Sequence, residues 1–214
     1  MLISGVNFPE ELTNAIKDNK LVVFVGAGVS MGKPTNLPNF TELVNYIANE
    51  TGYNFDEKIN QYDAFLGKLE HNGIDVKRKA AECIIEKQAK PNELHKSIIN
   101  LFGTKNVIRI VTTNYDQMIE KAIKKKSVLI YNAPALPLGN DFEGIVHIHG
   151  NQTDPKHMIL TDSDFGDAYL LEGYASRFLS KLFSEYAVLF IGYSYGDTVM
   201  TYLSRALPDK QSKK

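Results

Sequence analysis

The sequence is short of cysteine, of net charge and of long apolar runs. Among 214 residues Cys83 is the single cysteine, which excludes a disulfide framework and a zinc site of four cysteines. Its helical surroundings favour a core residue over a nucleophile. The 24 basic residues nearly balance 25 acidic ones, so the charge favours neither nucleic acid nor a membrane surface as a partner. No signal peptide or membrane span is visible, and we expect a cytoplasmic protein.

The most informative segment is LVVFVGAGVS, which starts at residue 21. Residues 21–25 are apolar and mostly β-branched, as in a buried parallel strand. Gly26 and Gly28 then remove side chains where the strand ends, so that a phosphate could approach the main chain. An ordinary tight strand-to-helix turn is the alternative. The usual dinucleotide fingerprint is not met, because Met31 stands where the third glycine belongs and Gly32 comes one residue late.

Short apolar segments alternate with helical patterns along the rest of the chain, which predicts a doubly wound, Rossmann-like α/β sheet in a single domain over residues 1–214. The predicted strands are 21–25, 106–114, 127–132, 144–150, 157–160 and 187–192. The predicted helices are 10–19, 40–50, three within 56–102, 116–126, 164–185 and 197–207. Residues from about 53 to 103 read as an all-helical insertion or lobe, after a helix that stops at Gly52.

Small, polar or ionisable residues follow four of the predicted strands. The segments are GAGVS from Gly26, TTNYD from Thr112, HG from His149 and GYSYGD from Gly192. In a parallel sheet of this class ligands bind beyond the carboxyl ends of the strands. The four segments together therefore predict one shared site.

GAGVS, TTNYD, HIHG and GYSYGD, in this order, resemble the motifs of the sirtuin superfamily. The closer resemblance is to the bacterial sirtuin-like branch that lacks zinc, which includes NAD-hydrolysing effectors of anti-phage defence of the Thoeris and defence-associated sirtuin types. The match covers residues 20–207, nearly the whole chain. It implies an NAD⁺ site without metal, with His149 and Asn114 as catalytic residues. The NAD⁺-binding residues that it implies are Gly26, Ala27, Gly28, Ser30, Phe40, Thr113, Asn114, Asp116, Gly192 and Ser194.

The resemblance also gives these residues separate roles. The turn at Gly26 would hold phosphate, and Asn114 with Asp116 would face the nicotinamide-side ribose and the carboxamide. His149 matches the catalytic histidine. Phe40 resembles the phenylalanine of a mobile segment that covers the nicotinamide pocket. The loop with Gly192 and Ser194 would hold the phosphates and the adenine-side ribose.

Departures from the family pattern narrow the expected activity. Asn39 and Thr41 stand where deacylating sirtuins carry aspartate and arginine, and the paired-cysteine zinc module is missing. These differences argue against protein deacylation and leave NAD⁺ cleavage unaffected. Because such effectors commonly carry a sensing domain, we expect this chain to be the catalytic part of a longer protein, controlled by a regulatory domain or partner and assembled as a homo-oligomer.

Cleavage of the nicotinamide–ribose bond releases a neutral base, so the leaving group needs no proton and the second carboxyl of ordinary glycosidases is unnecessary. The site needs a base for a ribose hydroxyl or a water, for which histidine is suited. The main expectation is an NAD⁺ glycohydrolase that makes nicotinamide and ADP-ribose, with cyclic ADP-ribose as a by-product. A non-catalytic NAD⁺ or ADP-ribose sensor is the alternative, and a deacylase is less favoured.

Several of these residues also have structural interpretations. His147 and His149 lie two apart on a predicted strand, which places both side chains on one face, and an H-x-H pair with His157 nearby can bind metal. We favour a hydrogen-bonded structural role for His147. Asp116 fits a helix-capping pattern as well as a ligand role. The remaining capping candidates are Asp197, Ser163 and Asp164, and Tyr193 and Tyr195 can either line the adenosine side or pack on the sheet.

Overall fold

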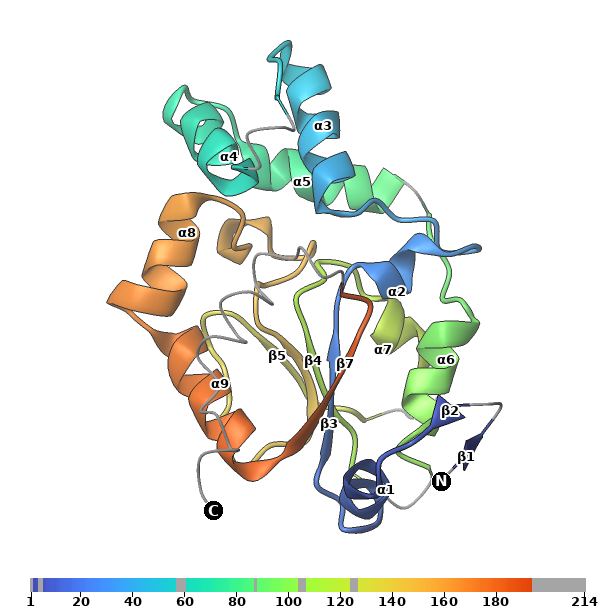
Figure 1. Ribbon diagram of the computed structural model, residues 1–214. Helices are drawn as coiled ribbons and strands as arrows, with labels where there is room; N and C mark the ends of the chain where they lie inside the picture. The colour runs from blue at the N-terminus through green and yellow to red at the C-terminus, as the bar shows by residue number, and fades with distance from the viewer. Residues whose placement is uncertain are drawn as a thin grey trace.

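Five parallel strands form a single sheet in the order β5–β6–β4–β3–β7 (Figure 1). The computed structural model describes residues 2–3, 6–56, 61–86, 88–103, 107–123 and 127–193. The strands are β3 Leu21–Val25, β4 Arg109–Thr112, β5 Ile130–Asn132, β6 Gly144–His147 and β7 Ala187–Ile191. The predicted α/β, Rossmann-like class is confirmed. A separate antiparallel pair, β1 Leu2–Ile3 and β2 Val6–Asn7, precedes the sheet.

Helices cover both faces of the sheet because its strands are apolar on both sides. In β3, Val22 and Phe24 face a cluster that includes α9 (Tyr174–Glu185), whereas Val23 and Val25 face the opposite cluster. The second face is covered by α1 Glu10–Lys17, α6 Glu93–Asn100 and α7 Met118–Ala122 (Figure 1). All five residues of β3 are buried, as its apolar sequence predicts.

A lobe of three helices lies over the carboxyl edge of the sheet (Figure 1). It consists of α3 Phe40–Thr51, α4 Tyr62–His71 and α5 Val76–Glu86. Met158 and Leu160, from a loop beyond β6, complete its apolar cluster. An ion pair of 2.5 Å between Lys77 of α5 and Asp164 of α8 (Asp162–Gly166) adds a polar link. The lobe is therefore fastened to the loops that follow the strands, while α6 packs on the sheet.

The predicted strand at 157–160 is wrong. Pro155–His157 form a 3₁₀ turn, η2, and the next three residues run in irregular backbone. One hydrogen bond, from the Ile159 N–H to the His149 carbonyl (3.0 Å), joins this segment to the end of β6. The strand positions beside β6 are already filled by β5 and β4. The apolar residues of the segment are buried between the lobe and the sheet.

The predicted long helix over 164–185 is interrupted. It begins at Asp162 as α8, passes into a π-helical segment, η3, at Asp167–Leu171, and restarts as α9 after Gly173, whose φ is +61°. Thr161 is the N-cap of α8 in a capping box with Asp164, so neither Ser163 nor Asp164 is the N-cap residue. The left-handed backbone at Gly173 breaks the run of helical residues.

Other local predictions are confirmed. Gly52 ends α3 with a φ of +73°, and Cys83 is buried in the core of the lobe. The expected helix over 197–207 lies outside the described residues, as do Ser194, Tyr195 and Asp197. Within the described part of the chain, every helix is too short or too polar to cross a membrane.

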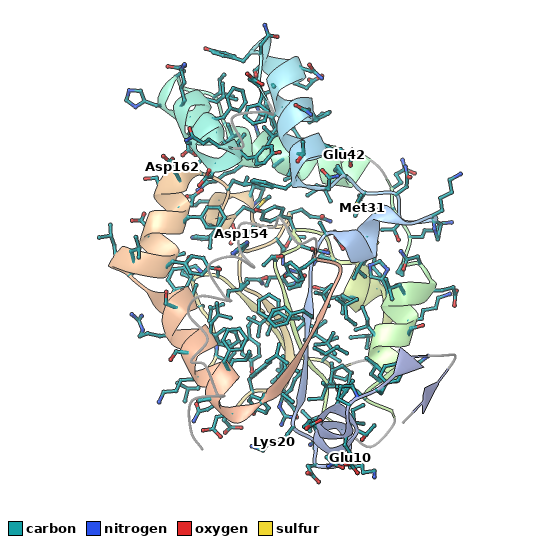
Figure 2. The ribbon with its side chains drawn as sticks, viewed as in Figure 1. Glu10, Lys20, Met31, Glu42, Asp154 and Asp162 are labelled. Atoms are coloured by element: carbon teal, nitrogen blue, oxygen red, sulfur yellow. The ribbon has the colours of Figure 1, made fainter. Side chains whose placement is uncertain are left out.

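Labelled side chains show where the two edges of the sheet lie (Figure 2). Glu10 and Lys20 lie at the amino edge, and Met31 and Glu42 lie near the carboxyl edge, where α2 (Gly28–Met31) meets the lobe. Met31, Glu42 and Cys83 are among the residues that line a pocket of about 300 Å³ there. The carboxyl edge thus combines the polar loop ends with the helical lobe.

Candidate functional site at the carboxyl edge of the sheet

The loops after β3 and β7 are in direct backbone contact. The N–H of Gly26 donates to the carbonyl of Ile191, and that of Gly28 donates to the carbonyl of Gly192, each at 2.9 Å. A Cβ atom on Gly26 would lie 2.8 Å from the Gly192 oxygen, and one on Gly28 would lie 2.9 Å from it. Glycine is required in the turn because the backbone of the neighbouring loop fills the space of a side chain.

This contact gives the glycines of the GAGVS turn a structural explanation. The Gly28 N–H is engaged by Gly192, and the N–H groups of Val29 and Ser30 bond to carbonyls within the turn itself. Ala27 is half-buried in the same turn. The structure therefore brings two of the predicted phosphate-binding loops together, and phosphate binding by their amides stays a prediction.

Tyr193 lies across the ends of β3 and β4. Its hydroxyl donates to the carbonyl of Val25 at 3.1 Å and lies 2.9 Å from the hydroxyl of Thr113. Its ring packs against Phe24 and Phe190. Of the two roles left open by the sequence, packing on the sheet is the one that the structure shows for Tyr193, and this packing also engages Thr113.

The side chain of Asn114 is tied to the turn after β3. Its Nδ2 donates to the carbonyl of Gly26 at 3.2 Å and lies 3.4 Å from the Ser30 hydroxyl. Its own N–H donates to the Thr112 hydroxyl at 3.0 Å. The side-chain oxygen, Oδ1, is buried and has no hydrogen-bond partner among the described residues. A buried acceptor without a partner is costly, so this atom marks a place where a ligand donor fits.

Ser30 joins two buried titratable groups. Its hydroxyl donates to Asp116 at 2.8 Å and lies 3.2 Å from Nε2 of His95. The other carboxylate oxygen of Asp116 accepts from the N–H of Met118, the first residue of α7, at 2.9 Å, although the N-cap residue of α7 is Gln117. Burial raises the pKa of Asp116, although the hydrogen bonds from Met118 and Ser30 oppose the rise. Burial also lowers the pKa of His95 to about 4.

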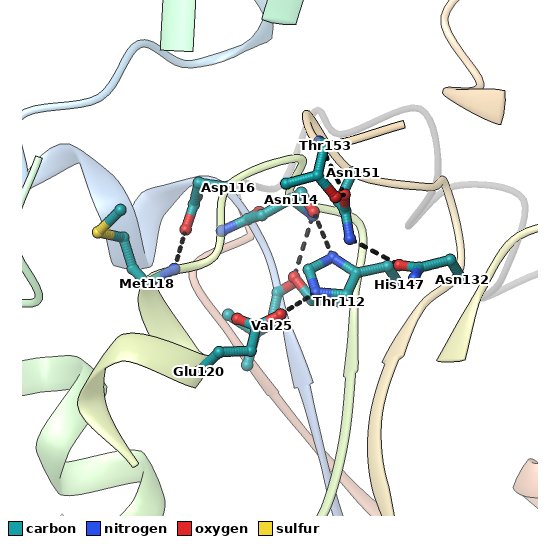
Figure 3. A network of polar contacts seen from close by, with 10 residues as sticks. All are labelled: Val25, Thr112, Asn114, Asp116, Met118, Glu120, Asn132, His147, Asn151 and Thr153. Atoms are coloured by element: carbon teal, nitrogen blue, oxygen red, sulfur yellow. Dashed lines mark hydrogen bonds and ion pairs between the residues drawn. The ribbon is translucent and has the colours of Figure 1, made fainter. Parts of the chain in front are cut away.

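His147 makes two buried polar contacts (Figure 3). Its Nε2 lies 2.5 Å from the Glu120 carboxylate, and its Nδ1 lies 3.2 Å from the main-chain carbonyl of Asn114. Burial acts to lower the pKa of His147, but Glu120, the Asn114 carbonyl and Asp116 together raise it. The predicted structural, hydrogen-bonded role is confirmed for this residue.

His149 lies on the other face of the sheet from His147, so the expected common face is wrong. The strand ends at His147, and a turn closed by the bond from the Gly150 N–H to the His147 carbonyl (3.1 Å) reverses the alternation. Nε2 of His149 lies 2.8 Å from the hydroxyl of Tyr169, and Phe165 packs edge-on at 5.2 Å between ring centroids. Burial lowers the pKa of His149 to about 3.

Phe40 and Asn39 lie at the start of the lobe. Asn39 is the N-cap of α3 in a capping box with Glu42, and Phe40 packs edge-on against Tyr62. Asn39 thus has a structural role at the position where deacylating sirtuins carry aspartate. The structure places Phe40 in the apolar cluster of the lobe.

The sequence reasoning did not identify His95, Glu120 and Tyr169 as members of the site. His95 follows the capping residue Asn92 by three positions. An isolated histidine on an amphipathic helix does not indicate a functional site in the sequence. Its contact with Ser30 spans 65 residues of sequence. Among the described residues no group of three or more histidine, cysteine or acidic side chains could hold a metal ion.

A parallel sheet with helices on both faces and glycine turns at its carboxyl edge defines a Rossmann-like α/β protein. Within that class, the chain belongs to the SIR2-like family, because the model of the SIR2-like domain matches residues 108–214. The resemblance to sirtuin-like domains seen in the sequence is confirmed.

Three relatives are similar over most of this chain. They are the uncharacterized protein y4cA of Sinorhizobium fredii (29% identical over 95% of this chain), defense-associated sirtuin 2 of Bacillus subtilis (23% over 88%) and the NAD(+) hydrolase ThsA of Bacillus cereus (22% over 92%). The chain spans 19% of the first two proteins and 41% of the third. The similarity thus concerns one part of much longer proteins.

The contact between the β3 and β7 loops predicts a large effect of Gly192→Ala. A Cβ atom there would lie 2.7 Å from the Gly26 oxygen and the Val29 nitrogen, at a φ of +81°. We expect the free energy of unfolding to fall by about 3 kcal/mol, from overpacking and a left-handed backbone together. Gly52→Ala is the matched control, because φ is +73° and nothing lies within 4 Å; it should cost about 1 kcal/mol. Equal losses in urea unfolding would contradict the close approach of the loops.

Burial of His149 predicts a loss of stability in acid. Its pKa in the folded protein is about 3, below the unfolded value near 6.5, so the unfolded chain takes up a proton first as the pH falls. Stability from this residue is complete above about pH 6.5 and declines by about 1.4 kcal/mol per pH unit below it. His149→Gln should reduce that slope between pH 6 and pH 4 in urea unfolding, with His71→Gln, at an exposed position of α4, as the matched control. A wild-type slope in His149→Gln would refute the buried neutral imidazole.

Proposed function

We propose that the protein is an NAD⁺ glycohydrolase that converts NAD⁺ and water to nicotinamide and ADP-ribose. The observation that carries this proposal is the Asn114 side chain. Its Nδ2 is committed to Gly26 and Ser30, which leaves Oδ1 as a buried acceptor in need of a donor. A ribose hydroxyl or a water supplies such a donor. The names of two relatives, NAD(+) hydrolase and defense-associated sirtuin, agree with this assignment.

His149 is the base of the proposed reaction. Burial lowers the pKa of His149 to about 3, which keeps the imidazole neutral at pH 7 but makes it a weak base, so the proposal requires this pKa to rise toward neutrality when the site opens. Its Nε2 faces the Tyr169 hydroxyl, so the proposal requires a substrate hydroxyl or water to replace Tyr169 as the partner of this nitrogen. Tyr169 lies in the π-helical segment η3, and Gly173 with its left-handed backbone follows that segment. A shift of η3 would open the imidazole to the substrate.

The chemistry needs no acid for the leaving group, because nicotinamide departs as a neutral molecule from the cationic pyridinium. Asn114 would hold the attacking water or the ribose hydroxyl, and His149 would take its proton as the new C–O bond forms. The lobe, fastened to the strand-end loops by Lys77 and Asp164, would limit the access of bulk water. Cyclic ADP-ribose forms instead when an adenine nitrogen replaces water as the nucleophile.

The same names support a wider proposal, in which the protein depletes NAD⁺ in anti-phage defence under the control of a sensing domain or partner. A homo-oligomer is part of this proposal. The second candidate function is a non-catalytic NAD⁺ or ADP-ribose sensor. The enclosure of His149 by Phe165 and Tyr169 favours the sensor, because an imidazole that is enclosed by neighbouring side chains can have a packing role without any catalytic role.

Release of nicotinamide from NAD⁺ by the purified full-length protein separates the two functions. We expect His149→Ala and Asn114→Ala to fold normally and to slow the release by about 100-fold or more, as for loss of a general base or of a positioned polar group. His71→Gln and Asn14→Ala, on exposed parts of α4 and α1, are the matched controls. NAD⁺ binding without any nicotinamide release would establish the sensor instead.

A further inference from the structure

His147 is a buried histidine for which the proposed reaction has no use. It lies at the end of β6, on the face covered by α7, and none of its surface is exposed. Its two ring nitrogens point at two oxygen atoms, the carboxylate of Glu120 and the main-chain carbonyl of Asn114 (Figure 3). A main-chain carbonyl and an ionised carboxylate only accept hydrogen bonds. Both contacts are hydrogen bonds at once only if both ring nitrogens carry a proton.

The environment of His147 favours this doubly protonated form. Glu120, on α7, is 2.5 Å away, and Asp116 in the preceding loop adds negative charge. These two carboxylates are the charged groups that act on the ring, and they raise its pKa against the effect of burial. The other carboxylate oxygen of Glu120 is buried without a partner among the described residues. A positive charge at His147 therefore offsets negative charge that burial would otherwise leave uncompensated.

The main chain of Asn114 depends on this contact. Its N–H donates to the Thr112 hydroxyl at 3.0 Å, and that hydroxyl donates in turn to the carbonyl of Val25 at 3.0 Å. On the other side, the Asn114 carbonyl accepts from His147. The peptide groups on both sides of the Asn114 side chain are thus tied to neighbouring strands. Small rotations about the main chain would move Oδ1, which lies at the end of the side chain.

We propose that His147 is a positioning residue, an imidazolium that bridges Glu120 and the Asn114 carbonyl and so holds the Asn114 carboxamide in the geometry that the reaction uses. The proposal rests on the proposed function for the role of Asn114. The bridge itself, however, is a property of the protein without substrate. Loss of the bridge would leave the strand ends in place and displace Oδ1 of Asn114, a buried acceptor without a partner among the described residues.

The protonation state is tested by ¹⁵N NMR of the full-length protein labelled at histidine, with the His147 signals assigned from their loss in His147→Gln. We expect both nitrogens of His147 to carry protons at pH 7 and the ring to lose one of them only at a pH well above 7, whereas His149 stays neutral. One unprotonated ring nitrogen on His147 at pH 7 would overturn the bridge. This measurement needs no enzymatic activity, so it tests the bridge independently of the proposed function.

The positioning role is tested with Glu120→Gln, His147→Gln and the double variant. Each single variant leaves one buried charge unpaired, so both variants should have a lower melting temperature. Both should also reduce the turnover number for nicotinamide release by about tenfold or more. The double variant removes both charges, so its melting temperature should recover. Its turnover number should stay at least about tenfold low, with the KM for NAD⁺ changed by less than about threefold.

Recovery of turnover together with the melting temperature in the double variant would show that the pair only stabilises the fold, and would overturn positioning. His157→Gln is the matched control, because His157 forms an exposed pair with Asp154 at 2.7 Å. If wild-type protein releases no nicotinamide, the proposed function fails. The ¹⁵N amide signals of Asn114 then test whether the bridge from His147 holds the Asn114 main chain in place. They should shift in the double variant and keep their wild-type positions in His157→Gln, and unshifted signals in the double variant would overturn it.

Discussion

The structure depends on one constraint, that polar groups buried at the carboxyl edge of the sheet must satisfy one another. The helical lobe lies over this edge, so water cannot serve every group that the strand ends place there. Ser30, Asp116 and Asn114 meet this requirement by bonding among themselves and to the backbone of neighbouring strands. Among the described residues, the few buried side-chain atoms left without a partner, such as Oδ1 of Asn114, are then informative.

The two histidines of HIHG, His147 and His149, meet this constraint with different partners. His147 has charged and carbonyl partners, which favour the protonated ring. His149 has a hydroxyl and an aromatic ring as neighbours, and its burial lowers the pKa and leaves the ring neutral. Two residues of the same type, two positions apart, therefore have pKa values shifted in opposite directions. The difference arises from the turn at Gly150, which sends the second ring to the opposite face of the sheet.

The sequence predicts the parts of the fold that are encoded locally. The strand at 21–25 and the break at Gly26 follow from β-branched residues next to glycine, and Gly52 ends its helix as expected. The prediction of a strand at 157–160 is wrong because a short apolar run fits a strand and a buried irregular segment equally well. Gly173 interrupts a helix whose periodic pattern continues on both sides. Here the left-handed backbone at one residue ends the helix, and the periodicity of apolar residues does not predict that conformation.

The candidate site shows the same limit more sharply. The motif residues are visible in sequence because they cluster after strands, and a parallel sheet must bring those ends together. Their partners are not visible, because Tyr169 reaches His149 across 20 residues and His95 reaches Ser30 across 65. These contacts depend on how α6 and η3 pack on the sheet. The partners in turn set the charge and the accessibility of the motif residues. Chemistry at this edge is therefore governed jointly by groups that a motif identifies and by groups that only the packing of the helices supplies.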